Sequence, residues 1–587
     1  KPNMAQKGII KVSKTGEVFS SVTENEGVYQ PVYEVQGLPG AVFEITALED
    51  VYTLDGTLRY SAGEVVDTIT TGEDGTAQSQ PLYLGKFQVK EIQFPHGMVN
   101  TGENVTNVEL VYAGQEVEVT ETSASFYNQR QKALVTLDKV LEQDETFGIG
   151  MNGEISAVTF GLYAQEDITA ADGSVIPADG LLEIVSVNEN GQAVCSTDLP
   201  FGSFYLKELS TDSHYLLNGE TFPFTFEYGG PSIAVVEISA NDGEAVTNEL
   251  IRGEIKGLKT DENGAGLGGA VIGLFKNDET EFSAENALAT ATSAENGSFS
   301  FSNVPYGNWV LKELESPEGF ILSDEVIPVT VEEDGQVVEI SLSNERVYGD
   351  LRLTKVDKDY PDNKLTGAEF EVYRDTNGNK ELDEGDELLG KLEETSTGIY
   401  EMSHILYGGV FVKETKAPEG FLLDENAYYL EITENGKIYE VENVAGIGFT
   451  NMAQTGSLRI EKTSSDGKVE GFSFRVTGAN GYDQTFKTDK NGEIFIEGLR
   501  VGDYTVSEVS DGASANYVLP ADKTVTIFAD KTTVAKMHNE LRDTPKTGDD
   551  SKPWLWAALM GVSAMGAAAL GAAAYVSKRR RDKNTAE

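Results

Sequence analysis

The sequence predicts an all-β chain of similar β-sandwiches in series, followed by a single C-terminal transmembrane helix. Two observations lead to this. The segment Asn3–Gly8 (Asn-Met-Ala-Gln-Lys-Gly) returns almost unchanged as Asn451–Gly456, and five asparagines each precede a lysine by 11 residues. Between these points, runs with period-two apolar alternation are separated by Asn-Gly and Asp-Gly turns. A fixed spacing of this kind marks a tandem array, and short strands with such turns favour sandwiches of about 90 to 120 residues.

The recurring Asn-to-Lys intervals divide the chain into consecutive segments. Residues 1–6 are expected to be the end of an upstream repeat, so that an export signal and a binding region would precede the numbered chain. The remaining predicted segments are repeat 1 (7–130), repeat 2 (131–250), repeat 3 (251–346), repeat 4 (347–453), repeat 5 (454–541), a short motif with its linker (542–552), the transmembrane helix (553–577) and a basic cytoplasmic tail (578–587).

The amino-acid composition, and above all the net charge, limits which molecules the repeats can bind. The 587 residues include 45 Lys and Arg against 97 Asp and Glu, a net charge of −52. Such a charge repels nucleic acid and anionic lipid, so neither is expected to bind the repeats. A hydrophobic content of 39% argues for folded modules. Cys195 is the single cysteine, which excludes an intramolecular disulfide.

Each repeat is predicted to open with a strand that carries an inward lysine. In repeat 5, Leu458, Ile460 and Lys462 alternate with polar residues and therefore share one face of a strand. The equivalent lysines of the five repeats are Lys14, Lys139, Lys259, Lys355 and Lys462.

Two later elements are expected to bring a carboxyl group into the same core. A predicted strand reads Leu-x-Gly-Ala-x-Phe in its clearest copies, 38–43 and 365–370. A further strand begins at a glycine and ends six residues on at a glutamate, as in 307–313, where Glu313 shares its parity with the apolar positions. The equivalent glutamates are Glu91, Glu208, Glu313, Glu414 and Glu508.

The last strand of each repeat supplies an inward carboxamide. An asparagine follows an apolar residue of the same parity, as Asn344 follows Leu342. The five asparagines are Asn128, Asn248, Asn344, Asn451 and Asn539.

Three polar side chains directed into one small core have two possible explanations. One is a buried, hydrogen-bonded ion pair with an amide. The other is a covalent bond, in which the lysine Nζ attacks the asparagine carboxamide and ammonia leaves. Burial favours the neutral amine that this attack needs, and a neutral glutamic acid in an apolar site can polarise the carboxamide and transfer protons. Spacing alone leaves both explanations open.

These elements resemble the Cna B-type, or SpaA-type, prealbumin-like domains of Gram-positive surface proteins and pilins. The resemblance rests on the lysine strand, the Leu-x-Gly-Ala-x-Phe strand and the stretch 413–421 (Lys-Glu-Thr-Lys-Ala-Pro-Glu-Gly-Phe), which 312–320 nearly repeats. It implies an intramolecular isopeptide bond in every repeat, with the glutamate as catalyst. The implied pairs are Lys14–Asn128, Lys139–Asn248, Lys259–Asn344, Lys355–Asn451 and Lys462–Asn539.

The C-terminus carries the pattern of a cell-wall sorting signal. Residues 554–576 have no charge and are long enough to span a bilayer, and the basic run 578–581 would keep the tail inside. Just upstream, Thr544-Pro545-Lys546-Thr547-Gly548 resembles the L-P-x-T-G motif, with threonine in the first position. The resemblance implies that a sortase cleaves after Thr547 and joins it to peptidoglycan. The alternative is an ordinary single-span anchor.

One segment resembles a calcium loop. Oxygen-bearing side chains occupy alternate positions from residue 375 onward, at Asp375, Asn377, Asn379, Asp383 and Asp386. The sixth position is Lys380 instead of glycine, and no helices are expected on either side, so an acidic hairpin tip is the favoured interpretation. No resident metal or cofactor is predicted.

Together these patterns predict an extracellular, cell-wall-anchored stalk of self-crosslinked repeats rather than an enzyme, since each glutamate would act once. The expected partners are sortase, peptidoglycan and a host or matrix ligand of an upstream adhesive region. A sortase-polymerised pilus subunit is the alternative. The lysine context that such pilins use is not matched by 360–364, which disfavours it.

Overall fold

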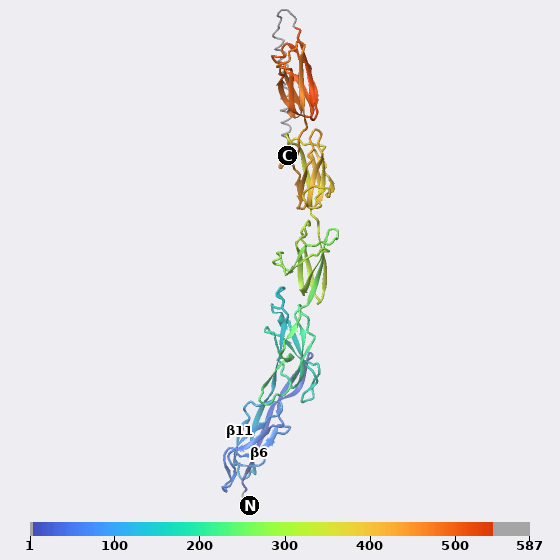
Figure 1. Ribbon diagram of the computed structural model, residues 1–587. Coiled ribbons are helices and arrows are strands. Elements are labelled where there is room, and N and C mark those ends of the chain that lie inside the picture. The colour runs from blue at the N-terminus through green and yellow to red at the C-terminus, as the bar shows by residue number, and fades with distance from the viewer. Residues whose placement is uncertain (1–3, 544–587) are drawn as a thin grey trace, which may run out of the picture. The chain divides into compact units, whose positions relative to one another are not determined.

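The computed structural model describes residues 4–543, and within them the chain is built of β-strands and three short 3-10 helices. It divides into two compact units between Arg346 and Val347. Repeats 1 to 3 belong to the first unit, and repeats 4 and 5 to the second. Figure 1 shows repeats 3, 4 and 5 each as its own block of strands, whereas strands of repeats 1 and 2 lie side by side. The predicted sorting motif, transmembrane helix and basic tail lie outside the described residues. No helix within 4–543 is long and apolar enough to cross a membrane.

Repeat 1 has two sheets and a long hairpin. Its strands are β1 (Lys7–Asn25), β2 (Val28–Gly37), β3 (Val42–Ala47), β4 (Val51–Tyr52), β5 (Leu58–Tyr60), β6 (Val65–Thr70), β7 (Thr76–Gln78), β8 (Leu82–Tyr83), β9 (Gly85–Gln93), β10 (Met98–Val99), β11 (Val105–Leu110) and β12 (Val119–Arg130). One sheet contains β1 and β12, and the order of the other is β11-β9-β3-β6.

Repeat 2 has the same two-layer plan. Its elements are β13 (Lys132–Leu141), η1 (Glu154–Ala157), β14 (Thr159–Ala164), β15 (Ile168–Thr169), β16 (Val175–Ile176), β17 (Leu181–Ser186), β18 (Gln192–Val194), β19 (Gly202–Ser210), β20 (Thr221–Phe226), β21 (Val235–Ser239), η2 (Ala240–Gly243) and β22 (Val246–Asn248). The lysine strand β13 pairs with β18, β21 and β22, and β17-β14-β19-β20 form the facing layer.

Repeat 3 is the simplest sandwich. Its strands are β23 (Arg252–Asp261), β24 (Val271–Lys276), β25 (Ala289–Thr292), β26 (Ser298–Pro305), β27 (Gly307–Glu315), β28 (Val326–Val331) and β29 (Val337–Asn344). The sheet β26-β23-β29 faces the sheet β25-β24-β27-β28.

Repeats 4 and 5 repeat this arrangement in the second unit. Repeat 4 comprises β30 (Tyr348–Asp357), β31 (Glu369–Arg374), β32 (Glu387–Lys391), β33 (Glu393–Ser396), β34 (Ile399–Leu406), β35 (Gly408–Lys416), β36 (Ala427–Ile432), β37 (Ile438–Glu440) and β38 (Phe449–Asn451). Repeat 5 comprises β39 (Thr455–Ser464), β40 (Ser473–Gly478), η3 (Ala479–Gly481), β41 (Asp483–Lys487), β42 (Glu493–Arg500), β43 (Gly502–Glu508), β44 (Tyr517–Val518), β45 (Lys523–Ile527) and β46 (Thr532–Leu541).

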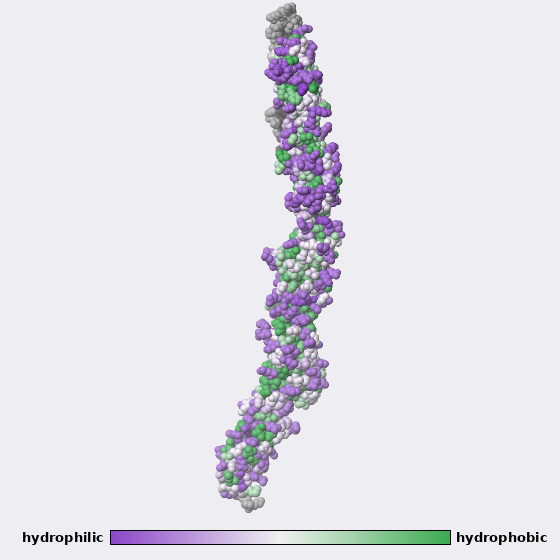
Figure 2. Space-filling view, viewed as in Figure 1, coloured by the Kyte–Doolittle hydropathy of each residue, from purple (hydrophilic) through white to green (hydrophobic). Residues whose placement is uncertain are grey.

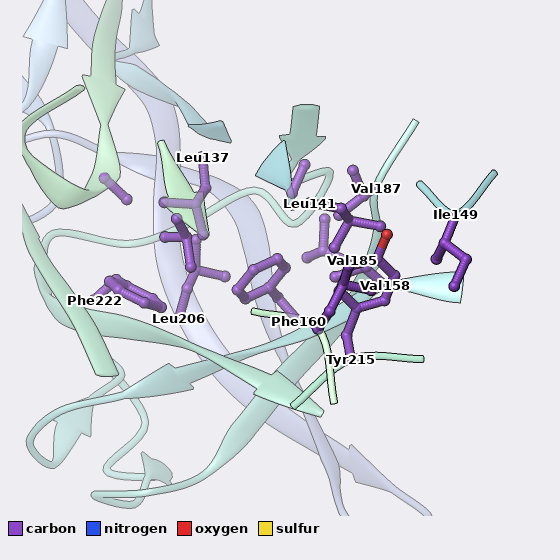
Figure 3. Packing of buried hydrophobic residues seen from close by; sticks show 14 of the residues in the cluster. Leu137, Leu141, Ile149, Val158, Phe160, Val185, Val187, Leu206, Tyr215 and Phe222 are labelled. Atoms are coloured by element: carbon purple, nitrogen blue, oxygen red, sulfur yellow. The ribbon is translucent and has the colours of Figure 1, made fainter. Parts of the chain in front are cut away.

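The apolar core of each repeat lies between its two sheets, as the alternating sequence pattern predicts. In repeat 2, Leu137 from one sheet and Phe160, Leu206 and Phe222 from the other are all buried (Figure 3). Hydrophilic side chains cover much of the visible surface, with hydrophobic ones scattered among them (Figure 2). This agrees with the strongly acidic composition.

The Leu-x-Gly-Ala-x-Phe motif is not a strand throughout, contrary to the sequence-based expectation. Strands β3 and β31 begin only after its alanine, and the glycine lies in the turn or bend that precedes each strand. Gly40 and Gly367 have φ of 78° and 79°, in the left-handed region that favours glycine. The recurring glycine is therefore explained by this turn.

A feature without a counterpart in the other repeats extends from repeat 1. Strands β1 and β2 form a hairpin whose far end lies against repeat 2, where Val28 pairs with Leu181 of β17. The backbone N–H groups of Ala171 and Asp172 donate to the carbonyls of Phe19 and Ser20, both at 3.0 Å. Repeats 1 and 2 are thus joined by backbone hydrogen bonds as well as by the linking chain.

Candidate functional site

The lysine and asparagine of each repeat lie on neighbouring parallel strands in a constant register. In repeat 3, Lys259 pairs with Leu342 and Asn344 pairs with Asp261, so that the asparagine is two positions beyond the lysine's own partner. Residues two positions apart on neighbouring strands face the same side of a sheet. The same offset recurs in the pairs β1–β12, β13–β22, β30–β38 and β39–β46.

The glutamate reaches the same point from the opposite sheet. Glu313 in β27 pairs with Ile272 of β24, directly after a register shift in that ladder. The other four glutamates each pair with the phenylalanine of the equivalent strand: Phe43 with Glu91, Phe160 with Glu208, Phe370 with Glu414 and Phe474 with Glu508. One sheet therefore supplies the lysine and the asparagine of each repeat, and the facing sheet supplies the glutamate, although the three residues are distant in sequence.

All fifteen predicted site residues are inside the sandwiches. None of the five lysines, five glutamates and five asparagines is more than 8% exposed. Burial of so many polar groups is costly unless they bond to one another, and most of them do. In repeats 1, 4 and 5, one oxygen of the glutamate and the Oδ1 of the asparagine are buried without a hydrogen-bond partner.

In every repeat the asparagine Nδ2 donates a hydrogen bond to the glutamate. The Nδ2–Oε distances are 3.2 Å in repeat 1, 2.9 Å in repeat 2, 2.8 Å in repeats 3 and 4, and 2.5 Å in repeat 5. The carboxyl group thus contacts the nitrogen that an attack on the carboxamide would release.

The lysine amine approaches the same carboxyl group in four repeats. Its Nζ lies 2.8 Å from Glu91, 3.3 Å from Glu208, 3.4 Å from Glu313 and 4.0 Å from Glu414. In repeats 2 and 3 the Nζ also donates to the asparagine Oδ1. In repeat 5, the Lys462 Nζ instead donates to the Thr463 carbonyl at 2.7 Å.

A backbone N–H group also donates to the glutamate carboxyl group in three repeats. The N–H groups of Asn218, Ser323 and Asp424 donate to Glu208, Glu313 and Glu414 at 2.6, 2.9 and 2.9 Å. These donors lie ten residues after each glutamate, on the segment that follows its strand. They orient the carboxyl group, and sequence spacing did not indicate them.

Burial shifts the protonation equilibria in the direction that the chemistry needs. It lowers the pKa of all five lysines, against the opposing effect of the nearby glutamates, and brings that of Lys355 to about 8. Burial also raises the pKa of Glu414 and Glu508. These shifts favour the neutral amine in all five repeats and the protonated carboxyl group in repeats 4 and 5.

Comparison with known proteins agrees with this architecture. The sequence matches the SpaA family, described as a prealbumin-like fold domain, over residues 32–124, 253–346, 349–445 and 456–541. Repeat 2 contains no matched segment, although its strands bring Lys139, Glu208 and Asn248 together as in the others. No curated protein matches the sequence.

Several solved structures are similar at low sequence identity. The Bacillus anthracis TIE protein is 18% identical, with 77% of this chain and 75% of that chain covered and a TM-score of 0.39. BcpA, the major pilin subunit of Bacillus cereus, is 15% identical, with coverages of 58% and 100% and a TM-score of 0.26. The pilus adhesin SpaC from Lactobacillus rhamnosus GG is 13% identical, with coverages of 66% and 57% and a TM-score of 0.27.

The matched segments include four of the five repeats and more than half of the residues, and the paired sheets and the turn glycines are common to the repeats. The chain belongs to the SpaA family of prealbumin-like fold domains.

Proposed function

We propose that the protein is a surface stalk whose five repeats are each closed by a Lys–Asn isopeptide bond. One observation supports this above the others: all five repeats bury a lysine, a glutamate and an asparagine in the same strand register. The asparagine bonds to the glutamate in each repeat, and the lysine amine approaches that carboxyl group in four of them. A set of plain structural ion pairs would not require the asparagine Nδ2 to contact the glutamate in every case.

The proposed reaction exchanges one nitrogen for another on the asparagine side chain. The neutral lysine Nζ attacks the asparagine Cγ, the new C–N bond forms, and the Cγ–Nδ2 bond breaks. The protonated glutamate donates its proton to Nδ2, which leaves as ammonia, and it takes up one proton from the attacking amine. The glutamate is restored, and the sandwich supplies the alignment that makes the step effectively unimolecular.

Such a bond would change the mechanical and thermodynamic behaviour of each repeat. It joins the first strand to the last, so that tension passes through the covalent link. It also closes a loop of about 80 to 115 residues, which by the chain-entropy estimate for disulfides is worth roughly 4–5 kcal/mol. This suits a chain with one cysteine and no possible internal disulfide.

The mass of the intact protein tests the crosslink. We expect the chain to be lighter than its sequence by five molecules of ammonia, and Glu313→Ala to restore one of them. The matched control Glu315→Ala removes a carboxylate two residues further along the same strand and should restore none. An unmodified mass for the wild type would rule the crosslinks out.

We further propose that the chain is anchored to peptidoglycan through Thr547 after sortase cleavage of 544–548. Thr547→Ala should move the protein from the cell-wall fraction to the membrane and medium, while Thr544→Leu should retain it in the wall. Unchanged wall anchoring of Thr547→Ala would contradict the proposal. High-mass ladders on a denaturing gel would instead favour the alternative, a polymerised pilus subunit.

A further inference from the structure

A twelve-residue loop in repeat 4 has the ligand spacing of a calcium site. It spans residues 375–386 between β31 and β32, and the pair Arg374–Glu387 closes its base. Calcium loops of this length use oxygens from positions 1, 3, 5, 9 and 12 and a backbone carbonyl at position 7. Here those side chains are Asp375, Asn377, Asn379, Asp383 and Asp386, and the carbonyl is that of Glu381.

The lysine at the sixth position does not disrupt this geometry. That position normally holds glycine because the chain turns sharply there, and Lys380 has φ of 61°, in the left-handed region. The lysine side chain leads out of the loop. Its Nζ lies 3.8 Å from Glu431 and 5.2 Å from the centroid of the Tyr429 ring. Its charge is therefore directed away from the proposed ligands.

The strongest evidence is a buried carboxylate oxygen without a partner. Asp375 is only 9% exposed, and its Oδ2 accepts a hydrogen bond from the Lys380 backbone N–H at 3.1 Å, which directs the carboxylate into the loop. Its Oδ1 is buried with no hydrogen-bond partner. A buried carboxylate oxygen left in this state is costly, and a cation in the loop would satisfy it.

The remaining side chains are already gathered at the same place. Asp383 Oδ2 accepts from the side-chain amides of Asn377 and Asn379 at 2.9 and 2.8 Å. Asp386 accepts from the backbone N–H groups of Thr376 and Asp383 at 3.0 and 2.9 Å.

Within residues 4–543, no three His, Cys, Asp or Glu side chains already converge as a metal cluster. A cluster of that kind consists of His, Cys, Asp and Glu side chains alone. Half of the ligands of this loop would instead be the amide oxygens of two asparagines and a backbone carbonyl. Binding would require the two asparagines to release Asp383 and turn their oxygens inward.

We propose that residues 375–386 bind one Ca²⁺ ion through these five side chains and the Glu381 carbonyl. Six oxygens at the tip of a hairpin suit calcium, whereas magnesium demands a more rigid octahedral shell and retains its waters. The bound ion would fix the β31–β32 connection. None of these residues takes part in the proposed crosslink, so either proposal can fail alone.

Terbium luminescence provides the test, since Tyr373 and Tyr429 lie beside the loop and can sensitise a bound lanthanide. We expect the whole chain to show tyrosine-excited Tb³⁺ emission that Ca²⁺ displaces and Mg²⁺ at the same concentration does not. The expected calcium Kd is on the order of 10⁻⁴–10⁻³ M, as in extracellular modules.

Variants of the loop distinguish this site from general attraction to an acidic chain. Asp375→Asn and Asp386→Asn should each weaken Ca²⁺ binding at least tenfold. Glu384→Gln removes the same charge from a non-ligand position and should bind as the wild type does. Equal loss in Glu384→Gln, or no calcium displacement in the wild type, would overturn the proposal. If circular dichroism shows that Asp375→Asn is misfolded, the half-buried Asp386→Asn decides.

Discussion

Arg500 of repeat 5 binds the carboxylate of Asp357 in repeat 4 through both of its terminal nitrogens. Asp357 is buried, lies two positions beyond Lys355 and pairs in register with Asn451. The same guanidinium contacts Asp359 at 2.5 Å and lies over the Tyr360 ring. The junction between these repeats is thus built directly on the strand that carries Lys355.

A similar contact joins repeats 2 and 3. Arg252, at the start of β23, pairs with Glu142 and Asp144 at 3.0 and 2.9 Å, just after the lysine strand of repeat 2. An arginine of the following repeat therefore contacts the carboxylates beyond the lysine strand of the preceding one at both junctions. We infer that these pairs restrict bending between neighbouring repeats within each unit.

Arg500→Gln should loosen the junction of repeats 4 and 5. It leaves the Asp357 carboxylate buried without its counter-ion, a change that costs about 3–5 kcal/mol for a buried pair. Amide hydrogen exchange in peptides covering 357–363 should rise more than tenfold. Arg475→Gln removes an exposed pair with Asp483 in the same repeat and should leave these peptides unchanged. Equal exchange in Arg500→Gln and wild type would contradict the interpretation.

Arg130 should hold the hairpin of repeat 1 against repeat 2. It is buried, forms ion pairs with Glu17 and Asp198, and lies 3.6 Å from the centroid of the Tyr33 ring. Arg130→Met should therefore cost about 1.5–3 kcal/mol and speed exchange in residues 17–36.

Lys132→Met is the matched control for this prediction, because Lys132 pairs with the same Asp198 from an exposed position. It should cost at most about 1 kcal/mol. Similar losses in the two variants would show that the buried guanidinium has no special role.

Asn451→Ala should make the free energy of unfolding of repeat 4 change with pH in the alkaline range. Without the carboxamide, Lys355 remains a free amine whose folded pKa, lowered by burial to about 8, is below its unfolded value near 10.5. The unfolded state then binds more protons between these values, so the free energy of unfolding rises with pH across that window, by roughly 3 kcal/mol in total. Urea denaturation at a series of pH values measures it.

Two comparisons sharpen this pH prediction. The raised pKa of Glu414 acts in the opposite sense, because it makes the folded state bind more protons than the unfolded state, so its effect cannot produce a rise of stability with pH. Asn451→Ala combined with Lys355→Met should remove the alkaline dependence. If the slope persists in the double variant, another group is its source.

Repeat 5 should form its crosslink last. Its lysine Nζ donates to the neighbouring Thr463 carbonyl and lies 4.3 Å from the centroid of the Phe472 ring, so it must turn before attacking Asn539. Repeat 3, in which Lys259 already contacts both Asn344 and Glu313, should react faster. Peptide mapping of freshly folded protein over time would show the order, and simultaneous closure of both repeats would contradict it.

Local periodicity was enough to predict much of the candidate site. Period-two alternation placed Lys259, Glu313 and Asn344 on core-facing sides, because strand parity is a property of neighbouring residues. The constant interval between each asparagine and the next lysine marked the repeats. The same reasoning misplaced the start of the Leu-x-Gly-Ala-x-Phe strand, since the backbone conformation of Gly40 is not visible in an apolar pattern.

The sequence by itself determined the all-β repeats and which polar side chains face their cores. Only the tertiary structure decided the parallel Lys–Asn register, the docking of the 7–37 hairpin on repeat 2 and the pairing of Arg500 with Asp357. These features join residues far apart in the chain, and long-range pairing depends on how whole surfaces fit together. Local alternation specifies which face a residue occupies but not which partner it meets there.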